Sequence, residues 1–342
     1  MKSIKTSHKK FFLLLVYLLI GLLYVNFLSL LPNELFRDRE NYLVYASTSE
    51  SIISTYPGII LFFNEPFFLY FNFFLNNYID FQLIPHLFVY IITTVYFYVI
   101  AVESKNPLTF ILGLLLSVTI PYILQNELVA LRQGLATAFF IIAFFYLKDE
   151  KKVILTLFIC SLFHSIFFIF LFFYFLNFIF LKNVSLNKKA IINFIWMFVF
   201  SLIAILVAKF FGLRQGDEYT GSSQIGGSGG AFVVFLLTLI YIYLWGDKSN
   251  KKLYEFSILG AIIFLTSYFL TPIAGRMFNS IMPFILILLV KESRYKDVIF
   301  LLMLNIIFAI LFFCGSYSSL LNVSDIQAIE ILNQYVKGFF VL

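Results

Sequence analysis

The sequence predicts an all-α polytopic membrane protein with ten or eleven transmembrane helices. Hydrophobic residues make up 61% of the 342 positions and charged residues only 12%, which is more apolar surface than one soluble core can bury. Apolar runs long enough to cross a hydrocarbon layer of about 30 Å recur from Phe11 to Cys314. No stretch has the composition of a separate soluble domain, so residues 1–342 are expected to form a single integral membrane domain.

The first helix is predicted over the apolar run of residues 11–31. Lys2, Lys5, Lys9 and Lys10 precede this run, which lacks a small-residue cleavage site and is longer than the core of a signal peptide. We interpret it as a retained helix with a cytoplasmic N-terminus, because lysines favour that side. The formal net charge of +6 does not indicate nucleic-acid binding, since the lysines lie in short clusters between apolar runs.

The later spans follow from hydropathy and from the positions of the lysines. They are predicted at residues 82–102, 107–124, 128–147, 190–211, 231–246, 253–271, 276–290 and 298–315. The run of residues 153–181 is too long for a typical span. Two short helices that turn near His164 and Ser165 keep every lysine cluster on the inner side, whereas a single crossing would move later clusters outside. We prefer the two helices, each too short for a full bilayer, and one tilted helix is the alternative.

The first outer loop, residues 32–81, contains a segment at residues 56–75 that is apolar enough to suggest a span. Asn64, Glu65 and Pro66 interrupt its centre, and a crossing here would invert all later loops against the positive-inside rule. We therefore expect a re-entrant or interfacial outer element, because broken backbone at membrane depth needs protein or water as a partner. The total is then eleven crossings with an outer C-terminus.

Two further outer elements are expected. Residues 212–230 are rich in glycine and serine and predict a flexible outer loop, which either closes over a substrate or is a plain connection. Residues 326–342 repeat apolar side chains at helical spacing and predict an amphipathic helix on the outer surface. Cys160 and Cys314 lie inside apolar runs without metal-ligand spacing, so neither a disulfide nor a metal site is indicated.

In this predicted topology most of the lysines and most of the arginines lie on opposite sides of the membrane. All lysines except Lys209 and Lys337 fall inside, and all arginines except Arg294 fall outside or at outer helix ends. Charge alone satisfies the positive-inside rule, whereas a planar guanidinium can hold a phosphate or carboxylate with two parallel hydrogen bonds. The pattern indicates an anionic ligand on the outer face; ion pairing with nearby acids is the alternative.

Four residues are hard to explain by solvation alone. Arg132 lies about one turn into a predicted helix, where an ionised group costs on the order of 2–3 kcal/mol unless it is paired. Arg276 stands at the outer start of a short helix and either binds a ligand or reaches the interface. His164, at the proposed turn, is either a proton carrier or a hydrogen-bonded structural residue. Glu65 precedes a helix-breaking proline and is either a base or a partner for an arginine.

The first outer loop also carries groups that could bind sugar, namely Asp38, Asn41, Tyr42 and Tyr45. An ordinary solvated loop with interface tyrosines explains them equally well. The sequence contains no nucleotide-binding glycine fingerprint and no HExxH motif, and its GxSxG match at residues 226–230 lies in the glycine- and serine-rich stretch rather than between a strand and a helix. ATP-driven transport and common hydrolase chemistry therefore have no support.

Five short motifs occur in order along the chain. They are Arg37-Asp38-Arg39-Glu40-Asn41-Tyr42, Asn64-Glu65-Pro66, Leu131-Arg132-Gln133-Gly134, Phe163-His164-Ser165 and Gly275-Arg276. Together, across roughly residues 11–290, they resemble the EpsG family of Wzy-type polysaccharide polymerases. The chain departs from the family pattern at Phe67, where a glycine usually follows the Glu-Pro pair.

The resemblance implies a bundle related to the GT-C glycosyltransferases in the bacterial cytoplasmic membrane. It implies an enzyme that joins oligosaccharide repeat units carried on undecaprenyl pyrophosphate at the non-cytoplasmic face, in capsule, O-antigen or exopolysaccharide synthesis. The lipid bilayer, a chain-length regulator and a flippase are the implied partners. An O-antigen-ligase-like transferase is one alternative, and a polysaccharide flippase or transporter, whose buried charges would line a pathway, is another.

This reaction needs cations for the pyrophosphate, a base for the acceptor hydroxyl and a surface for sugar. The catalytic candidates are Arg132, with Glu65 or His164 as the base. The substrate-binding candidates are Arg276 and Arg214 for the pyrophosphate, together with Gln133, Asp38, Asn41, Tyr42 and Tyr45. No cofactor is expected, and no metal is required because arginines can supply the positive charge.

Overall fold

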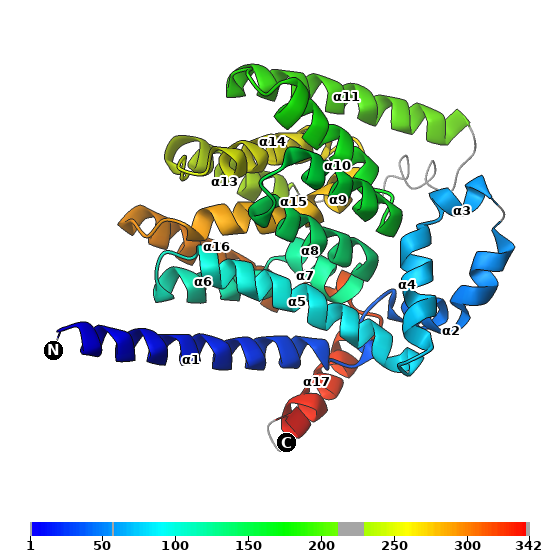
Figure 1. Ribbon diagram of the computed structural model, residues 1–342, viewed down its shortest axis with the longest axis horizontal. Helices are drawn as coiled ribbons and strands as arrows, with labels where there is room; N and C mark the ends of the chain where they lie inside the picture. Colours follow the sequence, from blue (N-terminus) through cyan, green and yellow to red (C-terminus); the bar gives the residue numbers. More distant parts are fainter. Residues whose placement is uncertain (1, 57, 211–228, 340–342) are drawn as a thin grey trace.

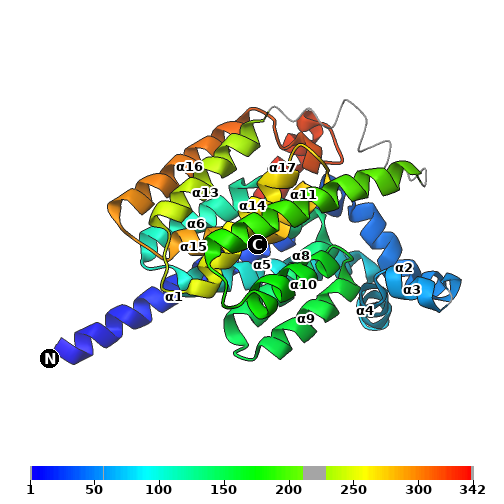
Figure 2. The same ribbon diagram turned by 90° about the horizontal axis from the view of Figure 1, so that it is seen from above.

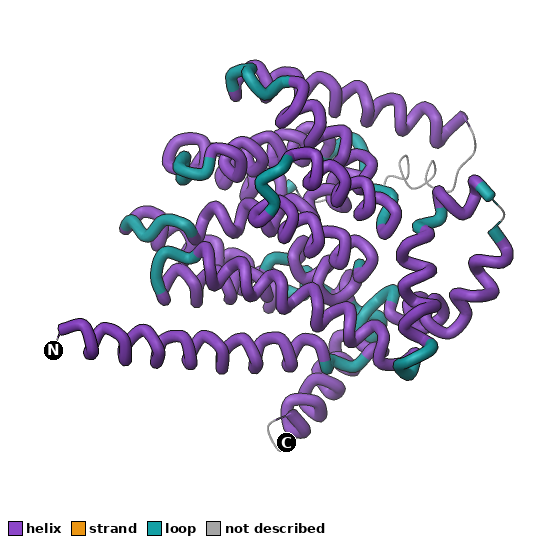
Figure 3. Tube along the Cα trace, viewed as in Figure 1, coloured by secondary structure: helices purple, strands orange, loops and turns teal. Residues whose placement is uncertain are grey.

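A computed structural model describes residues 2–56, 58–210 and 229–339 of the chain. Within these residues the chain forms helices joined by short loops, and no strand is longer than an isolated bridge between Phe36 and Leu321 (Figure 3). The predicted all-α fold is therefore confirmed.

The long helices lie side by side in a layered bundle (Figures 1 and 2). Five of the described helices are long and apolar enough to cross a membrane. These are α1 (Lys2–Ser29), α5 (Ile84–Glu103), α11 (Leu186–Phe210), α15 (Ile273–Val290) and α16 (Tyr295–Phe313). A sixth candidate is α6 (Pro107–Thr119) with α7 (Pro121–Leu124) and the following turn, bent by 68°. These helices confirm a polytopic membrane protein, and the count of eleven crossings stays a prediction.

The centre of the bundle is α15, which is buried on nearly all sides. It packs most extensively against α14 (Lys251–Ser267). A Cβ added to Gly260 on α14 would lie 2.6 Å from the side chain of Ile281, so only glycine allows this approach. Beside this contact Phe264 stacks on Phe278 with ring centres 3.8 Å apart. Because lipid chains are as apolar as these rings, the contact stabilises the bundle through close van der Waals packing.

The run of residues 153–181 forms two helices, as predicted. The first, α9, covers Glu150–Phe163, and α10 covers Phe167–Tyr174 and continues as a π-helix over Phe175–Phe180. The turn contains no proline or glycine. Its freed amides instead find side-chain acceptors: Ser165 N–H donates to Glu65 Oε1 at 3.1 Å, and Ile166 N–H donates to His164 Nδ1 at 3.3 Å.

The connection before Arg132 differs from the prediction. A π-helical turn covers Gln125–Val129, and α8 begins only at Leu131 and ends at Tyr146, so Arg132 stands at the start of its helix rather than one turn in. The turn is drawn inward because the buried Asn126 side chain donates to Asn279 O at 2.8 Å. It also lies so close to Gly134 that a Cβ there would overlap Asn126 O.

One end of the bundle gathers the turns that carry the lysines, and we call it the lysine-rich end. Here Lys291 pairs with Glu103 at 2.5 Å, and the buried Lys189 pairs with Glu255 at 2.7 Å. These pairs join turns far apart in sequence at the end where α1 begins (Figure 1). The predicted topology requires the lysines to gather at one end in this way. The side of the membrane that the lysine-rich end faces stays a prediction.

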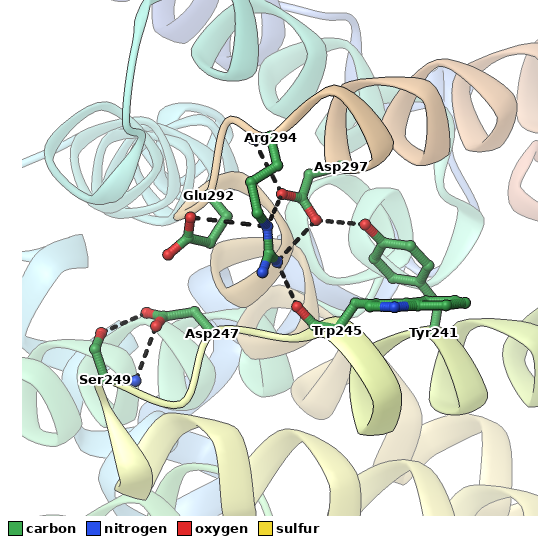
Figure 4. A network of polar contacts seen from close by, with 7 residues as sticks. All are labelled: Tyr241, Trp245, Asp247, Ser249, Glu292, Arg294 and Asp297. Atoms are coloured by element: carbon green, nitrogen blue, oxygen red, sulfur yellow. Dashed lines mark hydrogen bonds and ion pairs between the residues drawn. The ribbon is translucent and has the colours of Figure 1, made fainter.

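A polar network at the lysine-rich end holds α16 to α13 (Gly230–Trp245). Figure 4 shows Arg294 at its centre, with Nε donating to Asp297 at 2.6 Å and Nη2 donating to the carbonyl oxygen of Trp245. Tyr241 donates to the other oxygen of Asp297. The one arginine that the threading places inside therefore has a structural role, in which its donors are used within the protein.

The opposite end carries Arg37, Arg39, Arg132 and Arg276, and we call it the arginine-rich end. Three helices project there as an arch, namely α2 (Arg39–Thr55), α3 (Ile59–Phe63) and α4 (Pro66–Asn76), and α4 runs across the direction of the long helices (Figure 1). The segment of residues 56–75 is therefore two helices with a break at Asn64 and Glu65, which fits the expected re-entrant or interfacial element.

The C-terminal helix α17 covers Asp325–Phe339; it begins one residue before the range predicted over residues 326–342, of which residues 340–342 lie outside the described part. It packs on the end of α1, where Tyr335 donates to Phe27 O at 2.8 Å. Ile326 and Ile329 remain exposed on it, as expected for a helix at a membrane surface.

Candidate active site

The site is centred on an ion pair between Arg132 at the start of α8 and Glu65 at the break between α3 and α4. Pro66 begins α4, a position that proline favours, and Glu65 before it adopts a left-handed backbone with φ of 56°. Such a conformation costs on the order of 1–3 kcal/mol for a residue other than glycine. The ion pair and the hydrogen bond from Ser165 N–H compensate for this strain. Both carboxylate oxygens of Glu65 therefore have donors from other segments.

Aromatic rings surround the guanidinium of Arg132. Its central carbon lies 5.2 Å from the ring centre of Tyr45, 5.8 Å from Phe68 and 6.0 Å from Tyr42, which are cation–π distances. Only Nη1 is used by Glu65, and Nε is buried with no hydrogen-bond partner among the described residues. The rings and Glu65 hold the cation in place, and the Arg132 side chain remains 30% exposed.

His164 lies in the turn between α9 and α10, next to Ser165. Burial lowers the pKa of His164 to about 4; Glu65 opposes this shift, and the positive charges of Arg132 and Arg276 add to it. The imidazole is therefore neutral at pH 7. These interactions also place His164 within electrostatic reach of all three charged groups.

Arg276 lies in the first turn of α15, and its side chain is exposed. Within the part of the chain that the structure describes, its guanidinium makes no hydrogen bond or ion pair. Its carbonyl oxygen accepts a hydrogen bond from the buried Gln133 side chain, which also donates to Ser280 Oγ at 2.8 Å. Gln133 thus joins α8 to α15 and fixes the backbone of Arg276.

A cavity of about 440 Å³ opens beside the ion pair, inside the arch of α2, α3 and α4. We call it the arch cavity. Its lining consists of Asn41, Val44, Tyr45, Ile52, Tyr56, Asn64, Glu65, Leu69, Arg132 and Ser165.

The structure brings most of the predicted site residues together. Arg132, Glu65, His164 and Arg276 meet at the arginine-rich end, and Asn41 and Tyr45 line the arch cavity. Tyr42 is buried against Arg132 rather than open to the cavity. Three candidates lie elsewhere or are not placed: Asp38 is exposed outside the cavity at the start of α2, Gln133 lies between helices, and Arg214 is outside the described residues, as is most of the loop predicted at residues 212–230.

Sequence reasoning missed the role of Arg39, which it grouped with the other outer arginines. Arg39 is fully buried, and its Nε donates to Leu128 O at 2.7 Å while Nη1 donates to Asn33 at 2.9 Å. Burial lowers the pKa of Arg39 to about 9, so it keeps its charge at pH 7. It holds α2 against the turn that precedes Arg132, and nothing in the sequence distinguishes it from its exposed neighbour Arg37.

The arrangement can bind an anion through arginine, hold a carboxyl group in an ion pair and present a neutral imidazole beside both. Among the described residues no three His, Cys, Asp or Glu side chains lie close enough to hold a metal ion. Searches of curated proteins and of solved structures each found no match to the chain. The sequence profile of the EpsG family matches residues 54–327, a range that contains Glu65, Arg132, His164 and Arg276. Since this match covers most of the chain, the protein belongs to the EpsG family of Wzy-like polysaccharide polymerases.

Proposed function

We propose that the protein joins oligosaccharide repeat units carried on undecaprenyl pyrophosphate at the non-cytoplasmic face of the bacterial cytoplasmic membrane. One observation carries this proposal. Four separate segments, the start of α8, the start of α15, the α3–α4 break and the α9–α10 turn, bring two arginines, a carboxylate and a histidine together. They do so at the end opposite the lysine turns, which the positive-inside rule assigns to the cytoplasm.

In the proposed reaction the hydroxyl oxygen of the acceptor sugar attacks the anomeric carbon of the donor glycan. The bond from that carbon to the pyrophosphate oxygen breaks, and the lipid pyrophosphate leaves with the electron pair. The acceptor proton passes to a base. Negative charge grows on the leaving group, so fixed cations near it stabilise the transition state.

Arg276 and Arg132 can supply those cations. The guanidinium of Arg276 has no partner among the described residues, and that of Arg132 is partly exposed beside its bond to Glu65. A hydrogen bond from a charged donor contributes about 1.5–3 kcal/mol, so two such contacts account for a large part of the leaving-group stabilisation. Arg214 joins them in this proposal.

Glu65 is the better candidate for the base. Because His164 Nδ1 accepts the Ile166 N–H, the neutral ring carries its hydrogen on Nε2 and can only donate from that atom. Glu65 is a carboxylate held next to a guanidinium and faces the arch cavity. We therefore assign proton removal to Glu65 and hydrogen-bond donation to His164.

The test uses the purified protein in lipid nanodiscs with lipid-linked repeat units extracted from cells that lack the gene. We expect a ladder of glycans spaced by one repeat unit and one released lipid pyrophosphate per new bond. Arg276→Gln should slow both, whereas Lys337→Gln, which removes an exposed cation from α17, should not. Transfer of glycan only to a different acceptor would indicate a ligase, and movement of units without lengthening would indicate a flippase.

A further inference from the structure

The arch cavity has one charged wall and otherwise uncharged walls. Glu65 and Arg132 are the charged groups in its lining, and they pair with each other. The remaining polar groups are the amides of Asn41 and Asn64, the rings and hydroxyls of Tyr45 and Tyr56, and Ser165. The charges of the described lining residues therefore balance, and the exposed part of Arg132 is the group assigned above to the pyrophosphate.

These groups match the chemistry of a sugar. Amides and hydroxyls can exchange hydrogen bonds with sugar hydroxyls in both directions, and tyrosine rings offer flat apolar faces to the carbon side of a sugar ring. Val44, Ile52 and Leu69 supply apolar surface between them. The volume of about 440 Å³ lies within the range of roughly 300–1,000 Å³ that small-molecule sites occupy.

The position of the cavity relative to the charged groups distinguishes its ligand from the leaving group. Glu65 and Arg132 both line the cavity, which therefore borders on the ion pair, whereas Arg276 and His164 do not line it. The base faces the cavity, and the unpaired cation of Arg276 lies outside its lining. A sugar in the cavity presents its hydroxyl to Glu65, while the pyrophosphate lies toward Arg276.

We propose that the arch cavity binds the acceptor sugar and that this sugar is uncharged. The proposal rests on the function proposed above. It adds Ile52, Tyr56 and Asn64, which line the cavity but are not part of the ion pair, as residues that determine acceptor specificity.

The main test separates acceptor from donor. Repeat units freed from their lipid pyrophosphate by mild acid can accept a glycan but cannot donate one, so their KM is measured at a saturating concentration of lipid-linked donor. Ile52→Trp fills the cavity and should raise the KM of the free acceptor at least tenfold, with less than twofold change in the KM of the donor. The matched control is Ile53→Trp, because Ile53 is the next residue of α2 and does not line the cavity; it should behave as the parent protein does.

A second arm tests the uncharged sugar. An acceptor analogue whose terminal sugar carries a carboxylate should bind at least tenfold more weakly than the native unit, and Asn64→Lys should reduce that difference because it adds a cation to the cavity. Asn76→Lys, on the exposed surface of α4, should leave the difference unchanged. A native acceptor sugar that carries a carboxylate, phosphate or free amine would overturn the proposal.

The two proposals fail in different ways. If the parent protein neither lengthens glycans nor releases lipid pyrophosphate, the proposed function is wrong. If the parent lengthens glycans and Ile52→Trp uses the free acceptor as well as the parent does, the polymerase stands and the acceptor assignment is wrong.

Discussion

Replacement of Arg132 by lysine keeps the positive charge at the centre of the site and removes the planar guanidinium. The guanidinium gives Nη1 to Glu65 and its side chain is 30% exposed, so it can contact the carboxylate and a phosphate together. A lysine ammonium is a single point charge and cannot reproduce this fork. The substitution should therefore remove about one charge-assisted hydrogen bond from the transition state, worth about 1.5–3 kcal/mol. At about 1.4 kcal/mol per factor of ten, kcat/KM should fall by roughly 10- to 150-fold.

The stability of the Arg132→Lys variant should change little. The Arg132 side chain is 30% exposed, and a partly exposed ion pair contributes only about 0–1 kcal/mol, much of which lysine retains. The assay is release of lipid pyrophosphate by protein in nanodiscs, with thermal unfolding as the control for folding. A variant that works at the parent rate would refute the role of the guanidinium fork, and a variant that unfolds at a much lower temperature would refute the estimate of the ion pair.

Three further predictions follow from the same contacts. Glu65→Gln should reduce turnover at least a hundredfold with little change in donor KM, because the amide cannot take the acceptor proton; turnover close to the parent value would exclude Glu65 as the base. The pKa of His164 lies below its unfolded value of about 6.5, so the stability that its neutral form confers is complete above pH 6.5 and is lost as the pH falls toward 4. Thermal unfolding of His164→Ala should therefore depend less on pH in that interval than unfolding of the parent, and parallel curves would contradict the prediction. Lys189→Met should destabilise the protein by up to about 3–5 kcal/mol, because the buried Glu255 loses its partner at 2.7 Å and keeps only the 3.7 Å contact with the exposed Lys251; adding Glu255→Leu should recover much of the loss.

The fold class and the helical hairpin at His164 could be predicted from the sequence because both rest on physical rules that act along the chain. Hydropathy identifies the apolar helices, and the lysine clusters constrain how many times the chain reverses. The hairpin was predicted only because two crossings keep every lysine cluster on the same side of the membrane. The run of residues 153–181 contains no glycine or proline to mark a turn.

The start of α8 could not be predicted, because the deciding contacts come from distant segments. Asn126 reaches the backbone of Asn279, and the turn fits against Gly134 only when the chain is folded. A hydropathy analysis detects the apolar run that begins at Leu128, but it carries no information about contacts with distant segments.

The charged members of the candidate site were predicted, and so were Asn41 and Tyr45 among the uncharged residues that line the cavity, whereas Tyr56 and Asn64 were not named as binding residues. Arg132 and Glu65 stood out because charge in apolar surroundings is costly. Tyr56 and Asn64 carry no such cost, and only the folded arch shows that they share a cavity with Tyr45. Gln133 belongs to the same motif as Arg132, yet its direction on the helix turns it toward α15 instead of the cavity.

The central claim is that Arg132 and Arg276 hold the pyrophosphate while Glu65 faces the acceptor. A structure of the protein with a lipid-linked repeat unit whose anomeric oxygen is replaced by a methylene group tests this most directly. We expect phosphate oxygens within hydrogen-bond distance of both guanidinium groups and a sugar in the arch cavity. A pyrophosphate bound at the lysine-rich end, or one that contacts neither arginine, would contradict the account.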